Sequence, residues 1–328
     1  METYMALDRL VSDHGALREA WEVQPLLSRG LEGGEDLLSL DAVARLVDQH
    51  GLRLPYFRMV QDGQPLPASD YSRRVGRDRG QLTGVIDPHA VRAHLAAGAT
   101  LVLQGLRFYC AEISALCNGL STEIGHPVHA NAYLTPAFSN GAGRHYDDHS
   151  VFLRQLVGRK HWRIQAPVEQ WPSAPCTDAD IDTEVVLDVD LGPGDCLYVP
   201  RGFVHDGNTA AEPSLHLSFT LDDPPTWGEI LLTALAAEVE TRVPLRAILP
   251  MAYADDPGRL EAQAALMIDE ARRALDAIEA AVLVDGLLSR AERTLAESRH
   301  GAPGRSLTEF LGPTDDLTSD QHRSCAIA

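Results

Sequence analysis

The strongest constraint on the fold is a run of short β segments between about residues 128 and 222. Gly, Pro and Asp turns such as Gly158-Arg159 and Gly192-Pro193-Gly194 separate them. Short strands divided by turns in this way are typical of a closed or sandwiched antiparallel β structure. We therefore predict a mainly β jelly roll, a double-stranded β-helix, for residues 128–222. Its expected strands are VHANAYLTPA, SVFLRQLV, KHWRIQAP, EVVLDVDL, DCLYVP and SLHLSFTL.

Residues 1–127 are expected to form an α-rich lead-in with some β structure. A helix should begin near Ser39 and end at Gly51, and Asp87 should cap another in PHAVRAHLAAG. Asp62-Gly63 lies between apolar residues in LPYFRMVQDGQPLP and predicts a tight turn between two strands. TLVLQGL, which begins at residue 100, is expected to be a buried strand.

Residues 226–300 are expected to form a helical subdomain, because their apolar residues recur at three- and four-residue spacing. One helix should carry the first stripe and a longer helix the second. Such faces could pair with a second copy of the chain, so a homodimer is predicted. Residues 301–328, rich in Ser, Thr, Asp, Gly and Pro, are expected to be a loose tail. The stripes consist of Ile230, Leu231, Leu235, Val239, and of Ala271, Leu275, Ile278, Val282.

Composition limits the partners and the compartment. The formal net charge of -19 disfavours direct binding to nucleic acid or anionic lipid, and it makes a basic protein or peptide a candidate partner. Acidity also favours solubility by itself. No stretch approaches the roughly 20 apolar residues of a membrane span, and METYMALDRL has no signal-peptide pattern. Because the five cysteines form no CxxC pair, a cytoplasmic location without disulfides or membrane contact is predicted.

A histidine and an aspartate two residues apart suggest a metal centre. Because alternate residues of a strand point to one face, His145 and Asp147 can direct an imidazole and a carboxylate at one ion. The third ligand, His205, follows a Gly-Pro-Gly turn, an apolar strand and a Pro-Arg-Gly corner in LGPGDCLYVPRGFVHDG. This set leaves three positions of an octahedral ion open, which suits Fe(II) that binds a bidentate keto acid and O2. Other histidines lack this context and are expected to be structural or solvated: His126, His129, His149 and His161.

These motifs resemble the JmjC domain of the cupin-4 group, the ribosomal oxygenase family. The resemblance rests on residues 131–164, on LGPGDCLYVPRGFVHDG and on SLHLSFTL, and ALREAWEVQPLLSRG resembles the family's entry segment. It implies a cupin/JmjC jelly roll with His145, Asp147 and His205 as iron ligands. It also implies a dioxygenase that hydroxylates an amino-acid side chain in a protein or peptide and converts 2-oxoglutarate to succinate and CO2.

The resemblance further implies that Lys160 receives the distal carboxylate of 2-oxoglutarate. Independent chemistry agrees, because Lys160 should share a strand face with Trp162 and Ile164. A lysine on such an apolar face needs an anionic partner to be stable.

The remaining cosubstrate residues rest on the family pattern. Asn131 and a hydroxyl near Ser218 are expected to help hold 2-oxoglutarate, and Thr220 is an open alternative to Ser218. Tyr133 shares a strand face with Asn131 and is expected to line the pocket, although a buried tyrosine can also serve only the core.

Several other functions stay open. Family members of known activity modify ribosomal proteins and carry winged-helix regions, whereas about 100 residues follow Asp222 here. A hydroxylase of a free or carrier-bound amino acid or peptide in a biosynthetic pathway is therefore an alternative. A methyl-lysine demethylase would use the same centre. A non-catalytic metal-binding cupin is disfavoured by the complete ligand set with Lys160, and a DNA-associated regulator by the charge.

Overall fold

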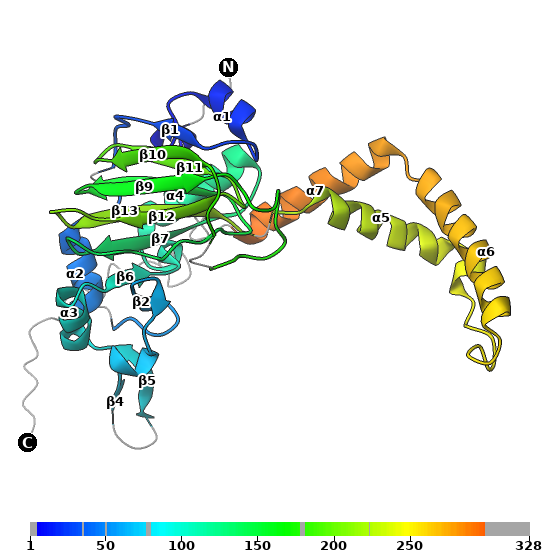
Figure 1. Ribbon diagram of the computed structural model, residues 1–328, viewed down its shortest axis with the longest axis horizontal. Coiled ribbons are helices and arrows are strands. Elements are labelled where there is room, and N and C mark those ends of the chain that lie inside the picture. The colour runs from blue at the N-terminus through cyan, green and yellow to red at the C-terminus, as the bar shows by residue number, and fades with distance from the viewer. Residues whose placement is uncertain are drawn as a thin grey trace, which may run out of the picture.

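The computed structural model describes residues 5–34, 36–49, 51–76, 80–177, 181–222 and 224–298 (Figure 1). The predicted loose tail, residues 301–328, lies outside these ranges. The largest sheet has eight strands in the order β1-β11-β8-β13-β7-β6-β2-β3. They are β1 (Leu26–Ser28), β2 (Phe57–Gln61), β3 (Gln64–Pro65), β6 (Thr100–Leu103), β7 (Val128–Thr135), β8 (Val151–Val157), β11 (Cys196–Val199) and β13 (Ser214–Leu221).

A three-stranded antiparallel sheet, in the order β10-β9-β12, forms the second layer of the jelly roll (Figure 1). Its strands are β9 (Lys160–Gln165), β10 (Val185–Leu191) and β12 (Val204–Asn208). A separate hairpin, β4 (Ser72–Val75) and β5 (Leu82–Ile86), projects from the amino-terminal part of the fold (Figure 1). These antiparallel layers confirm the predicted jelly roll.

Both faces of the large sheet are buried. Because successive side chains of a strand point to opposite faces, the sheet separates the interior into two cores. Along β13, Leu217 and Phe219 pack with the apolar sides of α2 (Leu40–Gln49), α3 (Pro88–Ala96) and α4 (Ala111–Ile124). The other core lies between the two sheets and contains Leu153, Trp162, Ile164, Leu197 and Phe203. Polar residues that face this second core are therefore enclosed between the two sheets.

The lead-in follows its local signals closely. Asp87 caps α3 by accepting hydrogen bonds from the backbone N–H groups of His89 and Ala90 at 3.0 and 3.2 Å. The β2–β3 hairpin turns at Asp62-Gly63, as predicted, and α1 (His14–Ala20) lies in the predicted entry segment. Sequence reasoning missed α4 and the β4–β5 hairpin.

Three helices extend from the β layers as an arm (Figure 1). The first is α5 (Trp227–Thr241), which begins with a capping box between Thr226 and Glu229. α6 (Pro257–Asp276) lies at the far end, and α7 (Ala280–Ser298) returns to contact α5 and α4. None of the helices in the described ranges is long and apolar enough to cross a membrane.

One prediction for the helices of the arm is wrong. The stripe from Ala271 to Val282 was predicted to lie on one longer helix, but α6 ends at Asp276 and α7 begins at Ala280. No glycine or proline occurs between them, and the apolar spacing continues across the break. Periodicity alone therefore could not locate the end of the helix.

Candidate metal centre

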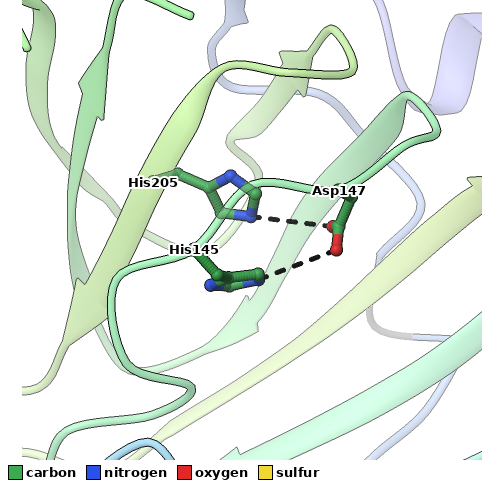
Figure 2. Close-up of side chains that lie close together, drawn as sticks. All are labelled: His145, Asp147 and His205. Carbon is green, nitrogen blue, oxygen red and sulfur yellow. Dashed lines mark ion pairs between the residues drawn. The ribbon is translucent and has the colours of Figure 1, made fainter. Parts of the chain in front are cut away.

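Two histidines and an aspartate converge at one end of the space between the sheets (Figure 2). His145 Nε2 lies 3.9 Å from Asp147 Oδ1, and His205 Nε2 lies 3.8 Å from Asp147 Oδ2. The potential ligand atoms of the three residues all lie within 4.8 Å of one another. The structure therefore brings together the three residues predicted as metal ligands, in an arrangement that can hold one ion.

A reciprocal backbone pair sets the spacing of the two histidines. The His145 N–H donates to the His205 carbonyl at 3.1 Å, and the His205 N–H donates to the His145 carbonyl at 2.7 Å. The predicted strand at His145 is absent, because this segment forms only isolated bridges, and His205 lies in the regular strand β12. The bridge still directs the side chains of His145 and Asp147 toward one point.

The Pro-Arg-Gly corner positions Asp147. The Gly202 N–H donates to the Asp147 carbonyl at 2.8 Å. Gly202 has φ +82°, and a Cβ at this position would lie 2.9 Å from the Glu169 carbonyl oxygen, so glycine is required. Arg201 donates from Nε to Glu22 at 2.6 Å and ties the corner to the lead-in.

Both imidazoles are oriented for metal binding. His145 Nδ1 lies 2.7 Å from the Gly143 carbonyl, and His205 Nδ1 lies 2.9 Å from the Phe203 carbonyl. A carbonyl only accepts, so Nδ1 carries the proton and Nε2 keeps its lone pair for an ion. Burial, together with the nearby His145, lowers the pKa of His205 to about 4, so this ligand is neutral at physiological pH.

The pocket beside these residues contains Lys160, whose side chain points into the space between the sheets. Lys160 is 2% exposed, and its Nζ donates to Thr135 Oγ1 at 3.3 Å. Among the residues that the structure describes, no carboxylate pairs with it, and burial is the only influence on its charge. Burial lowers its pKa to about 7. The pocket is lined by Tyr133, Ala142, His145, Asp147, Val151, Leu153, Lys160, Trp162, His205, Gly207, His216 and Ser218.

Two glycines give the lysine its space. A Cβ at Gly141 would lie 2.8 Å from Lys160 Nζ, and a Cβ at Gly207 would lie 2.9 Å from Lys160 Cε. A side chain at either position would force Lys160 to move. The backbone is therefore shaped around an extended Lys160.

The other predicted cosubstrate residues divide into two groups. Tyr133 and Ser218 line the pocket, whereas Thr220 and Asn131 are not among its lining residues. Asn131 Oδ1 instead accepts a hydrogen bond from the Gly105 N–H at 3.0 Å. The structure therefore favours Ser218 over Thr220, and it does not bring Asn131 into the pocket.

Sequence reasoning missed His216. This buried residue stacks on Tyr133 with ring centroids 4.9 Å apart, and it meets Trp162 edge to face at 5.4 Å. Burial and the charge of Lys160 hold its pKa well below the usual range, so the ring is neutral. The alternation of β13 could have revealed it, because His216 lies on the same face as Ser218.

One further histidine lies near the centre although the sequence assigned it no site role. His149 Nε2 is 3.8 Å from Asp147 Oδ2, and His149 Nδ1 is 3.0 Å from Asp148 Oδ1. Its side chain is 31% exposed.

Comparisons with known proteins agree with these motifs. The JmjC domain family matches residues 107–229. A bifunctional lysine-specific demethylase and histidyl-hydroxylase NO66 from Brugia malayi is 36% identical over 55% of this chain and 27% of its own length. Ribosomal oxygenase 1 from Danio rerio is 30% identical over 74% of this chain and 45% of its own length. The chain thus spans less than half the length of these curated relatives.

Among solved structures, the Escherichia coli ribosomal oxygenase YcfD in complex with cobalt and 2-oxoglutarate has a TM-score of 0.48. It is 19% identical and covers 79% of this chain and 67% of its own. The domain match and the sequence relatives carry the similarity. Residues 107–229 therefore match the JmjC domain family, and the chain is similar in sequence to the ribosomal oxygenases.

Proposed function

We propose that the chain is an Fe(II)- and 2-oxoglutarate-dependent oxygenase that hydroxylates an amino-acid side chain in a protein or peptide. The observation that carries this proposal is the presence of a buried, carboxylate-free Lys160 in the same pocket as His145, Asp147 and His205. Two imidazoles and one carboxylate fit Fe(II), and an unpaired ammonium fits the distal carboxylate of a keto acid. Iron bound there would supply the redox chemistry that couples keto-acid decarboxylation to hydroxylation.

The residues of the chain would bind, orient and shield the reactants. His145, Asp147 and His205 would hold the ion, with both rings fixed by their Nδ1–H hydrogen bonds. Lys160 would anchor 2-oxoglutarate, and Ser218 would add a hydroxyl hydrogen bond. The lining residues Tyr133, Val151, Leu153 and Trp162 would exclude water from the pocket. Asn131 would have a supporting role at most, through Gly105.

The substrate is defined less narrowly than the cosubstrate. The names of the relatives include both hydroxylase and demethylase activities. We infer a protein or peptide substrate, with basic segments favoured by the net charge of -19, and no direct contact with nucleic acid or membrane. A cytoplasmic location fits the free cysteines Cys110, Cys117, Cys176 and Cys196.

We also propose that residues 226–300 serve as a dimerisation subdomain beside the jelly-roll core of residues 128–222. The helical arm buries only Ile230 and Ala274 among its described residues in α5, α6 and α7. Large apolar side chains remain exposed on it, including Leu232 at 67% and Val282 at 66%. A second copy of the chain would cover this surface.

The test combines two measurements. Purified protein with Fe(II) and 2-oxoglutarate is incubated with candidate basic peptides and with lysate proteins, and succinate is measured together with peptide mass. We expect substrate-dependent succinate and a product heavier by about 16 Da, one oxygen atom. Loss of a methyl group would instead indicate demethylation. The absence of succinate under all these conditions would contradict the proposal.

A further inference from the structure

His149 occupies a position beside the metal centre that resembles the positions of the two predicted histidine ligands. Its Nε2 lies 3.8 Å from Asp147 Oδ2, and His205 Nε2 lies at the same distance from that oxygen. His145 Nε2 lies 3.9 Å from Asp147 Oδ1. Three imidazole nitrogens therefore surround one carboxylate at nearly equal distances.

The hydrogen bond at the other ring nitrogen determines what His149 presents to the centre. His149 Nδ1 lies 3.0 Å from Asp148 Oδ1, and an ionised carboxylate only accepts. Nδ1 therefore carries a proton, and Nε2 is the nitrogen that faces Asp147 and the centre. A carboxylate at the second ring nitrogen is one of the partners that orient metal-ligating histidines in proteins.

His149 also has room to move. It forms part of the wall of a groove between the Pro-Arg-Gly corner and the start of α5, together with Asp148, Pro172, Arg201 and Thr226. The side chain is 31% exposed, compared with 17% for His145 and 5% for His205. It can therefore turn toward the centre or toward the groove.

We propose that His149 is a fourth, exchangeable ligand of the ion held by His145, Asp147 and His205. The inference rests on the proposed function of this centre and extends it. The three predicted ligands form a compact group, with donor atoms within 4.8 Å, to which His149 does not belong. Binding thus requires a rotation of its side chain. With His149 bound, an octahedral ion has two open positions, which suffice for a bidentate keto acid but not for O2 as well.

His149 would therefore control whether O2 can reach the ion. It would occupy the position that O2 needs and would leave toward the groove when the substrate arrives. This release would make room at the ion only once the reactants are in place. The groove that receives the ring lies next to the centre, so a substrate entering there would meet His149 first.

The number of imidazole ligands can be counted directly. The full-length protein is loaded with Cu(II), and nitrogen couplings are recorded by pulsed electron paramagnetic resonance. We expect three coordinated imidazoles in the parent and two in His149→Ala and in His149→Gln. Cu(II) affinity should fall by roughly tenfold in both variants, the order expected when ligation is impaired. His161→Ala is the control, because His161 pairs with Asp188 and Asp190 on the outer face of the small sheet.

Two imidazoles in the parent, with equal affinities in the parent and both variants, would overturn the inference; His149 would then be only an ionic partner of Asp147. Such a result would leave the proposed function intact if the parent still formed succinate from 2-oxoglutarate with Fe(II). Conversely, three imidazoles in a protein that never turns over 2-oxoglutarate would support the ligand and contradict the function.

Discussion

Lys160 and Trp162 lie two residues apart on β9, and Lys160 Nζ is 5.0 Å from the centroid of the Trp162 ring. The aromatic face offers a cation partial compensation for lost hydration. It does not replace a carboxylate, and burial still lowers the pKa of Lys160 to about 7. The protein thus keeps a poorly compensated amine in a closed pocket, which is a costly arrangement unless an anion binds there.

The first prediction concerns cosubstrate affinity. Lys160→Ala should weaken 2-oxoglutarate binding by roughly 30- to 1000-fold, because an unpaired carboxylate in this pocket costs about 2–4 kcal/mol. Lys160→Arg should restore binding only in part, because Gly141 and Gly207 leave space for an ammonium and not for a longer planar group. Anaerobic calorimetric titration of the Mn(II)-loaded proteins measures both effects.

Arg159→Ala is the matched control, because Arg159 is the neighbouring cation but pairs with Glu212 on the surface. It should bind 2-oxoglutarate as the parent does. Undiminished affinity in Lys160→Ala would mean that another cation receives the carboxylate or that the cosubstrate is a different molecule.

The second prediction concerns stability and pH. The pKa of Lys160 is about 7 in the folded protein and near 10.5 when the chain is unfolded, so the unfolded state binds more protons between these values. The free energy of unfolding should therefore rise with pH across this window, by at most about 1.4 kcal/mol per pH unit. Below pH 7 this contribution should be constant.

Lys160→Met removes that proton linkage while keeping an unbranched side chain. Without cosubstrate, the variant should be more stable than the parent at pH 7, and the difference should shrink as the pH approaches 10. Urea unfolding of both proteins at several pH values tests this. A difference that is independent of pH would show that Lys160 remains fully protonated in the folded state.

The strands of the jelly roll and the corner before His205 could be anticipated because they depend on local rules. Alternation along the chain places Lys160 and Trp162 on one face, and the Pro-Arg-Gly corner places His205 at the mouth of the barrel. The approach of His145 to His205 depends instead on a bridge between distant segments. His145 pairs with His205 across 60 residues, and no local period encodes such a register.

The side-chain contact of Asn131 also could not be predicted from the local sequence. Its strand face was predicted correctly as that of Tyr133, but its side-chain partner, Gly105, comes from a separate part of the chain. The break between Asp276 and Ala280 was also invisible, because the residues between them are compatible with a continuous helix.

The third prediction concerns the ion. His145→Ala or Asp147→Ala should abolish Fe(II)-dependent succinate formation and weaken metal binding by at least about 100-fold, since each removes one of three ligands. The fold should persist, because apolar residues such as Leu153 and Ile164 form the adjacent core without the ion. Calorimetric metal titration and circular dichroism separate these effects. Full turnover by a folded Asp147→Ala protein would exclude Asp147 as a ligand.

The last prediction concerns assembly through the helical arm. An apolar groove lies between α5 and α7, and Val282 lines it while remaining 66% exposed. If a second copy covers this face, Val282→Glu should bury a charge in the interface and weaken the dimer by roughly 100-fold or more. Val284→Glu introduces the same charge at an exposed position on the opposite face of α7, outside the lining of the groove, and should leave the dimer intact. Sedimentation velocity at micromolar concentration distinguishes the three proteins, and a parent that sediments as a monomer would refute the dimer.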